Sequence, residues 1–179
     1  MIGRNSAVMV AIDFQGSLFQ VMHDKDKLLA NAVGVVRGAR ILNLPAIVTQ
    51  QVPSKLGPTV PAIAREMQGI TPVDKESFSC WDNKIFREKL ETFSRNNIIV
   101  CGIECHVCVY QTVVDLIENG YMVHVVADAV SSRTKENRRI GLTAMEKRGA
   151  KLTSAEMLLF ELLRTAADPK AKEIFKIVK

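Results

Sequence analysis

The stretch Ala7-Val8-Met9-Val10-Ala11-Ile12, which ends at Asp13, decides the fold of this 179-residue chain. Its apolar residues follow one another without alternating with polar ones, a pattern typical of a strand buried on both faces of a parallel sheet. Shorter apolar runs of the same kind recur along the chain, at residues 46–48, 98–101, 122–126 and, more weakly, 150–153. We therefore expect a mainly parallel sheet, with residues 7–12 as one of its strands.

Segments with the length and apolar spacing of helices separate these runs. They are residues 26–43, 82–95, 107–119, 135–148 and 154–165. Strands that alternate with such helices predict an α/β fold, here a Rossmann-like three-layer α/β/α sandwich with right-handed crossovers. We expect residues 1–179 to form a single domain.

Two further segments stand outside this alternation. Proline and glycine punctuate residues 51–72, so we expect an irregular excursion with a short helix near 60–67 that folds over a site. Residues 169–179 predict a C-terminal amphipathic helix that docks on a neighbouring subunit.

Composition narrows the class of protein. The chain is 47% hydrophobic and 24% charged, with a formal net charge of +5. It holds no run of about 18 apolar residues, so we expect no membrane span. We see no secretory signal and take the cytoplasm as the default location, leaving an organelle such as the mitochondrion open. Three of the four cysteines lie between residues 101 and 108, which predicts reactive thiols in a reducing compartment.

Three chemically active residues follow predicted strands or the irregular excursion. Asp13 ends the first strand, Lys75 follows residues 51–72, and Cys108 lies where the helix after the apolar run 98–101 begins. Ligands of parallel sheets bind beyond the carboxyl ends of the strands, so these side chains could meet at one edge. A cysteine at a helix N-terminus beside a lysine has a lowered pKa, and a nearby carboxylate can move its proton. Together the three suit acyl transfer.

Each of these residues also fits a structural role when it is taken alone. An aspartate after a buried strand often caps a turn, and Lys75 lies between two acids as in a solvated loop. Cys108 alone fits a buried small hydrophobic residue. Spacing by itself leaves both interpretations open.

Three motifs in order resemble the isochorismatase-like cysteine hydrolase family. They are Ile12-Asp13-Phe14-Gln15, then Lys75-Glu76-Ser77-Phe78, then Gly102 followed six residues later by Cys108-Val109. The resemblance covers roughly residues 7–165. Within the family, the chain is most similar to the uncharacterised branch, which is related to nicotinamidases and isochorismatases.

The resemblance implies a catalytic triad. Cys108 would be the nucleophile, Asp13 the general base and acid, and Lys75 their electrostatic partner. It also implies a non-proline cis peptide at Ile103–Glu104, with the backbone N–H groups of Glu104 and Cys108 forming an oxyanion hole.

The sequence departs from the nicotinamidase pattern at the metal site. Nicotinamidases carry metal-binding histidines after the second strand, whereas Val48-Thr49-Gln50-Gln51-Val52 contains none. The histidines of this chain, His23, His106 and His124, are far apart in sequence. We therefore expect no metal site and no cofactor.

A cysteine nucleophile favours a small carbonyl substrate such as an amide or carbamate. Isochorismatases cleave a vinyl ether by acid catalysis without such a nucleophile, and this alternative stays open. Gln15 or Gln51 could offer an amide to the substrate, and Phe19 and Trp81 could wall an apolar pocket. Core or subunit-interface roles for Phe19 and Trp81 fit equally well. We expect a homo-oligomer with a small-molecule substrate and no membrane partner.

Cys105-His106-Val107-Cys108 also has the Cys-x-x-Cys spacing of redox motifs. No proline separates the cysteines, so we rank dithiol chemistry below hydrolysis, although a Cys105–Cys108 disulfide could switch off the nucleophile. A zinc site is not expected, because a second Cys-x-x-Cys is missing.

The remaining rival is nucleic-acid binding, including a ribonuclease role. Its basis is the charge of +5 and the basic stretches 133–139 and 170–179. These stretches also hold acids, and aromatic residues make up only 6% of the chain, which gives no stacking platform. We do not expect a nucleic-acid partner.

Overall fold

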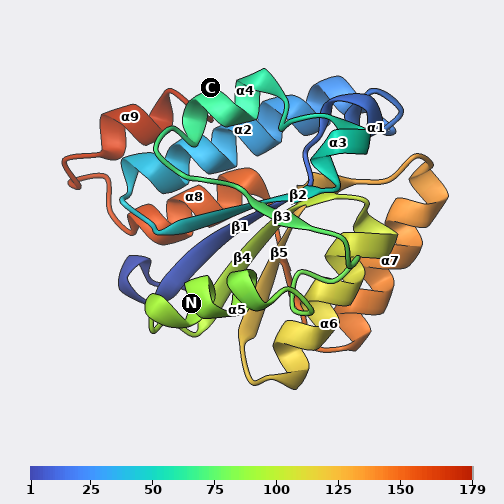
Figure 1. The fold of residues 1–179 in the computed structure, drawn as a ribbon. Coiled ribbons are helices and arrows are strands. Elements are labelled where there is room, and N and C mark those ends of the chain that lie inside the picture. Colours follow the sequence, from blue (N-terminus) through green and yellow to red (C-terminus); the bar gives the residue numbers. More distant parts are fainter. Residues whose placement is uncertain (179) are drawn as a thin grey trace.

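The computed structural model describes residues 1–178 and shows a parallel sheet between two layers of helices (Figure 1). The strands are β1 (Ala7–Ile12), β2 (Ala46–Gln51), β3 (Val73–Lys75), β4 (Asn97–Ile103), β5 (Met122–Ser131) and β6 (Lys151–Thr153). Every strand pair is parallel, and the order across the sheet is β3-β2-β1-β4-β5-β6. The predicted three-layer α/β/α fold is confirmed.

The helices cover both faces of the sheet. They are a 3-10 turn η1 (Arg4–Ser6), α1 (Gly16–Gln20), α2 (Lys25–Ile41), α3 (Pro53–Leu56), α4 (Pro61–Glu66), α5 (Lys84–Thr92), a π-helical turn η2 (Cys105–Val109), α6 (Tyr110–Glu118), α7 (Lys135–Lys147), α8 (Ala155–Leu163) and α9 (Ala171–Phe175). Figure 1 shows α2, α4, α8 and α9 on one face and α5, α6 and α7 on the other. Side-chain caps fix several starts; Ser154, for example, accepts from the N–H of Met157 at the beginning of α8.

The absence of alternation in β1 follows from burial on both faces. Met9 and Ala11 pack in the core beneath α2 and α8, whereas Val8, Val10 and Ile12 pack in the core beneath α5 and α6. Each fully buried aliphatic side chain contributes about 1.5–3 kcal/mol. Because β1 is central in the sheet, the residue after it is held at the middle of the carboxyl edge.

The structure departs from the prediction at β3 and at the C-terminus. β3 has only three residues, two of them charged, so it carries no apolar run to reveal it. The C-terminal helix is shorter than predicted. Ala171 and Ile174 are buried in the core of their own chain, and the ring of Phe175 lies 5.9 Å from Phe160. Ala171 and Ile174 thus pack within their own chain, and docking of the segment on a neighbouring subunit stays a prediction.

The irregular excursion contains two short helices. The predicted helix near 60–67 is α4, and residues before it form the short α3. Neither these helices nor any other within residues 1–178 are long and apolar enough to cross a membrane.

Candidate active site

Asp13 and Lys75 meet at the carboxyl edge of the sheet, across the end of β2. Asp13 follows β1 in a left-handed conformation, with φ of 50°, and its backbone N–H donates to the carbonyl of Thr49 on β2. Thr49 Oγ1 donates to Asp13 Oδ1 at 2.7 Å. Lys75 ends β3, and its Nζ lies 2.7 Å from Asp13 Oδ2, with both side chains 0% exposed. The pair is thus a fully buried ion pair.

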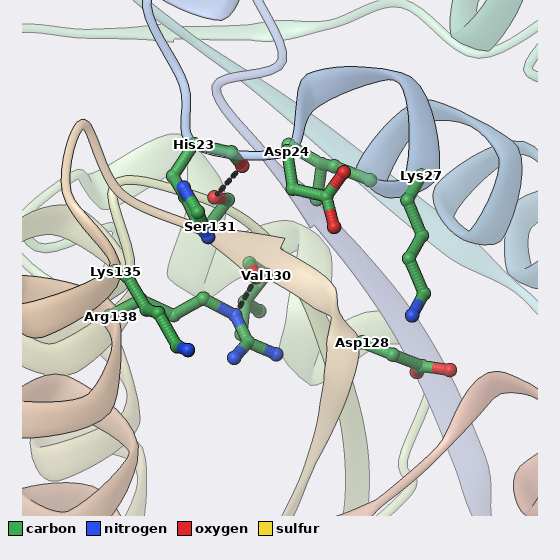
Figure 2. Close-up of a pocket in the computed structure, with 9 residues that line it drawn as sticks. His23, Asp24, Lys27, Asp128, Val130, Ser131, Lys135 and Arg138 are labelled. Atoms are coloured by element: carbon green, nitrogen blue, oxygen red, sulfur yellow. Dashed lines mark hydrogen bonds between the residues drawn. The ribbon is translucent and has the colours of Figure 1, made fainter.

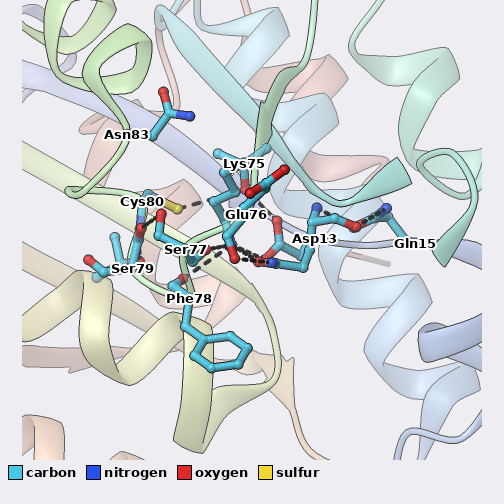
Figure 3. A network of polar contacts seen from close by, with 12 residues as sticks. Asp13, Gln15, Lys75, Glu76, Ser77, Phe78, Ser79, Cys80 and Asn83 are labelled. Atoms are coloured by element: carbon cyan, nitrogen blue, oxygen red, sulfur yellow. Dashed lines mark hydrogen bonds and ion pairs between the residues drawn. The ribbon is translucent and has the colours of Figure 1, made fainter. Parts of the chain in front are cut away.

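The donors of Lys75 are directed mainly at other acceptors (Figure 3). Nζ donates to Gln51 Oε1 at 2.6 Å and to the carbonyls of Ser77 and Phe78 at 3.1 Å each. Asp13 Oδ2 is close to the ammonium but accepts no well-directed hydrogen bond within residues 1–178. A buried carboxylate oxygen with a free lone pair is available to take a proton from a neighbouring group.

Burial opposes the charged form of Lys75. The charge of Asp13 nevertheless raises the pKa of Lys75 above its usual value. The lysine therefore stays an ammonium beside the carboxylate at neutral pH.

Cys108 lies in the π-helical turn η2, directly before α6, and is 6% exposed. Burial raises the pKa of its thiol to about 12; the charge of Lys75 lowers it, while the charge of Asp13 raises it. The expectation of a lowered thiol pKa is wrong for this structure, because burial and the adjacent carboxylate outweigh the lysine. The resting site holds a neutral thiol beside Asp13.

The backbone before Cys108 has the geometry that the family resemblance implies. The Ile103–Glu104 peptide is cis. The side chain of Glu104 turns away to Arg133, with Oε2 3.1 Å from the arginine Nε. The backbone N–H of Glu104 donates to no protein oxygen in the described part of the chain, which leaves it free for a ligand.

Helix α7 packs directly on this turn. A Cβ built on Gly141 would lie 2.9 Å from the carbonyl oxygen of Cys105, so only glycine allows this approach. Cys105 Sγ lies 3.5 Å from the carbonyl of Arg138 on the same helix. The position of the Cys108 turn therefore depends on α7.

The two glutamines predicted to bind substrate hold the protein together instead. Gln15 donates to the carbonyls of Gln51 and Gly57 and accepts from the N–H of Gln51. Gln51 accepts from Lys75 and donates to the carbonyl of Glu76. Both amides are thus engaged within the chain, and they position Lys75 rather than face a substrate.

The two aromatic candidates make packing contacts. Phe19 is buried in the core, where its ring lies 6.5 Å from Phe14. Trp81 packs edge-on against Tyr121, which follows α6, at 5.9 Å. Both side chains thus have packing partners within the chain, and a role in walling a substrate pocket stays a prediction.

Sequence reasoning missed Thr49 and Cys80. Cys80 is buried with Sγ 3.8 Å from Thr49 Oγ1, and its backbone N–H donates to Thr112 on α6. Burial, with the charge of Asp13, raises the pKa of Cys80 to about 11. The sequence shows only that Cys80 follows Lys75 by five positions; nothing in it indicates that the loop folds back onto Asp13.

Two further features bear on ligands. A cavity of about 650 Å³ lies beside Lys75; its lining includes Val52, Glu76, Ser77 and Asp82 but not Asp13 or Cys108. All four cysteines are free thiols. Within residues 1–178, no three histidine, cysteine or acidic side chains are grouped so that they could hold a metal.

Comparisons with known proteins give the family. The Isochorismatase domain model matches residues 7–157. The secreted isochorismatase effector Isc1 of Phytophthora sojae is 38% identical over 98% of this chain and 85% of its own length. Isochorismatase domain-containing protein 2 of Danio rerio is 36% identical over 99% of this chain and 90% of its own.

Solved structures resemble this chain over nearly its whole length. The structure of MAR1 ribonuclease from Caenorhabditis elegans is 36% identical, with a TM-score of 0.93, and covers 99% of this chain and 91% of its own. The YcaC gene product of Escherichia coli is described as an octameric hydrolase of unknown specificity. It is 25% identical, with a TM-score of 0.93, and the match covers 98% of this chain and 89% of that one. This chain therefore belongs to the isochorismatase family and is an isochorismatase-like hydrolase.

Proposed function

We propose that the chain hydrolyses a small amide, carbamate or related carbonyl compound through an acyl-enzyme on Cys108. The observation that carries the proposal is the buried Asp13–Lys75 ion pair, whose Asp13 Oδ2 is 2.7 Å from the lysine yet lacks a directed hydrogen bond. A carboxylate oxygen that accepts no directed hydrogen bond can remove the proton of a neighbouring neutral thiol as attack begins.

The first half of the reaction forms the acyl-enzyme. Cys108 Sγ attacks the carbonyl carbon while Asp13 takes the thiol proton. The backbone N–H groups of Glu104 and Cys108 stabilise the oxyanion, a contribution of about 3–4 kcal/mol in enzymes with such a hole. Asp13 then gives its proton to the leaving amine as the carbon–nitrogen bond breaks.

The second half releases the product. A water molecule attacks the thioester while Asp13 takes one of its protons, and the thiol leaves with that proton as the acid product forms. Lys75 carries a positive charge throughout and stabilises Asp13 each time the carboxylate is regenerated. Three donor contacts to Gln51, Ser77 and Phe78 hold its Nζ in place.

The test is to trap the acyl-enzyme. The purified chain is mixed with a panel of small amides and carbamates, quenched in acid and measured by intact mass spectrometry. We expect a mass increase that maps to Cys108 and is absent in Cys108→Ala, which should fold normally. Cys101→Ala, at a buried strand position, is the matched control and should retain the adduct. Turnover that persists in Cys108→Ala would refute the nucleophile.

The panel also separates two other candidates. Isochorismate belongs in the panel. If the chain is a vinyl-ether hydrolase that uses Asp13 as the acid, Cys108→Ala should retain isochorismate hydrolysis and Asp13→Asn should lose it. A ribonuclease role is favoured by the 36% identical relative named MAR1 ribonuclease. RNA cleavage that disappears in Asp13→Asn, in a preparation with matched purity, would move the assignment to this class.

The oligomeric state is a separate proposal. We infer a homo-oligomer, since the YcaC gene product with the same fold is described as octameric. Light scattering coupled to size exclusion gives the mass directly, and a value of 19.8 kDa would refute it.

A further inference from the structure

A second cavity lies between the first turn of α2, the end of β5 and the first turn of α7 (Figure 2). Its volume is about 270 Å³, and its charged lining residues are Asp24, Lys27, Asp128, Lys135 and Arg138. Asp13, Lys75 and Cys108 do not line it, so it is separate from the site described above.

The cavity lies where β5 continues beyond β6. β6 pairs only with residues 124–126, and β5 continues past its end. Arg138 binds backbone carbonyls of β5 there: its Nε donates to the carbonyl of Val130 at 2.9 Å, and Nη2 donates to the carbonyl of Ala127. These bonds fix the guanidinium, which Figure 2 shows extending between Lys135 and Asp128.

The opposite wall is fixed by hydrogen bonds as well. The loop before α2 is tied to β5, because the N–H of His23 donates to the carbonyl of Ser132 at 2.9 Å and Ser131 Oγ donates to the carbonyl of His23 at 2.7 Å. The cavity is therefore preformed, which lowers the ordering cost of binding.

Its cations are free to bind. Lys27, Lys135 and Arg138 form no ion pair within residues 1–178. Of the two acids, Asp128 already accepts from the N–H of Ala155 at 2.8 Å through Oδ1, so that this carboxylate caps α8. Both lysines lie in first turns of helices, where the backbone dipoles add positive potential.

We propose that this cavity binds a small phosphorylated ligand that also carries hydroxyl groups. Lys27, Lys135 and the unused N–H groups of Arg138 bind the phosphate, and this arrangement from two helices suits its several oxygens. Asp24 and the free oxygen of Asp128 accept hydrogen bonds from the hydroxyls. The volume equals that of about nine water molecules, enough for a phosphate with a short polyol.

The test is calorimetric titration of the full chain with ribose 5-phosphate, ribose and inorganic phosphate at one fixed ionic strength. We expect ribose 5-phosphate to bind most tightly, inorganic phosphate more weakly, and ribose not measurably at millimolar concentration. Lys27→Gln combined with Lys135→Gln should weaken ribose 5-phosphate binding by at least about tenfold. Lys147→Gln, in the last turn of α7, is the matched control and should change it less than about twofold.

Two more variants make the result specific. Asp24→Asn should weaken ribose 5-phosphate binding but not inorganic phosphate binding, because only the sugar needs the carboxylate. Cys108→Ala should bind as the parent does, so failure of the proposed hydrolysis leaves this inference testable on its own. Absence of ribose 5-phosphate binding, or an equal effect of Lys147→Gln and the double lysine variant, would overturn it. Arg138 is left intact, since it also holds the β5 backbone.

Discussion

Replacing Lys75 by methionine tests whether the buried ion pair holds the acid in place. Two unit charges 2.7 Å apart attract by about 6 kcal/mol at an effective dielectric constant of about 20. Lys75→Met keeps the length of the side chain but leaves the carboxylate of Asp13 buried without a countercharge. Removal of one partner from a buried pair costs about 3–5 kcal/mol of unfolding free energy, and we expect a loss of that size.

A double-mutant cycle isolates the pair from the other contacts of Lys75. Asp13→Asn is combined with Lys75→Met, and urea unfolding is measured for all four proteins at neutral pH. The double variant should lose less stability than the sum of the singles, with a coupling energy of at least about 2 kcal/mol. The exposed pair Lys84–Glu88, 3.5 Å apart, is the control, with a coupling of about 0.3–0.5 kcal/mol. Equal coupling in the two pairs would refute the reasoning.

Two further predictions concern the catalytic turn and the far edge of the sheet. Gly141→Ala places a Cβ 2.9 Å from the carbonyl of Cys105, so it should lower kcat on any substrate identified and lower the Tm. Gly16→Ala, where a Cβ meets open space at the start of α1, should leave kcat unchanged and should not lower the Tm. Burial, with the charge of Lys151, lowers the pKa of His124 below its usual value. The folded chain then binds fewer protons there than the unfolded chain, so stability should fall as the pH drops below about 6.5. Urea unfolding across that range should give a free energy of unfolding that depends less on pH for His124→Gln than for the parent. An unchanged pH dependence in the variant would contradict the role given to His124.

The sheet and two members of the candidate triad can be predicted from the sequence for the same reason. The apolar run 7–12 and the run 98–101 mark neighbouring central strands, and parallel strands bring the residues after their carboxyl ends to one edge. Asp13 after β1 and Cys108 after β4 are therefore expected at the same edge, and the pairing of β1 with β4 in the structure brings them together. Burial of both faces is the reason that such runs are recognisable in the sequence.

Lys75 illustrates the information that sequence pattern cannot supply. β3 is three residues long and at the edge of the sheet, so its existence depends on pairing with β2 rather than on its own composition. The glutamines show a second limit. An amide at a strand end suits a ligand and a backbone carbonyl equally, and only the folded loop around Gly57 decides that Gln15 is already occupied.

The occupied glutamines change how a substrate carbonyl can be recognised. With Gln15 and Gln51 engaged in the chain, the N–H groups of the turn that holds Cys108 are left to bind the oxyanion in the proposed reaction. The position of those groups is fixed by η2 and by the packing of Gly141 against it. A small displacement of α7 would then move the oxyanion donors while leaving Asp13 and Lys75, which belong to β1 and β3, where they are. Variants at this contact should therefore affect catalysis more than the stability of the buried ion pair.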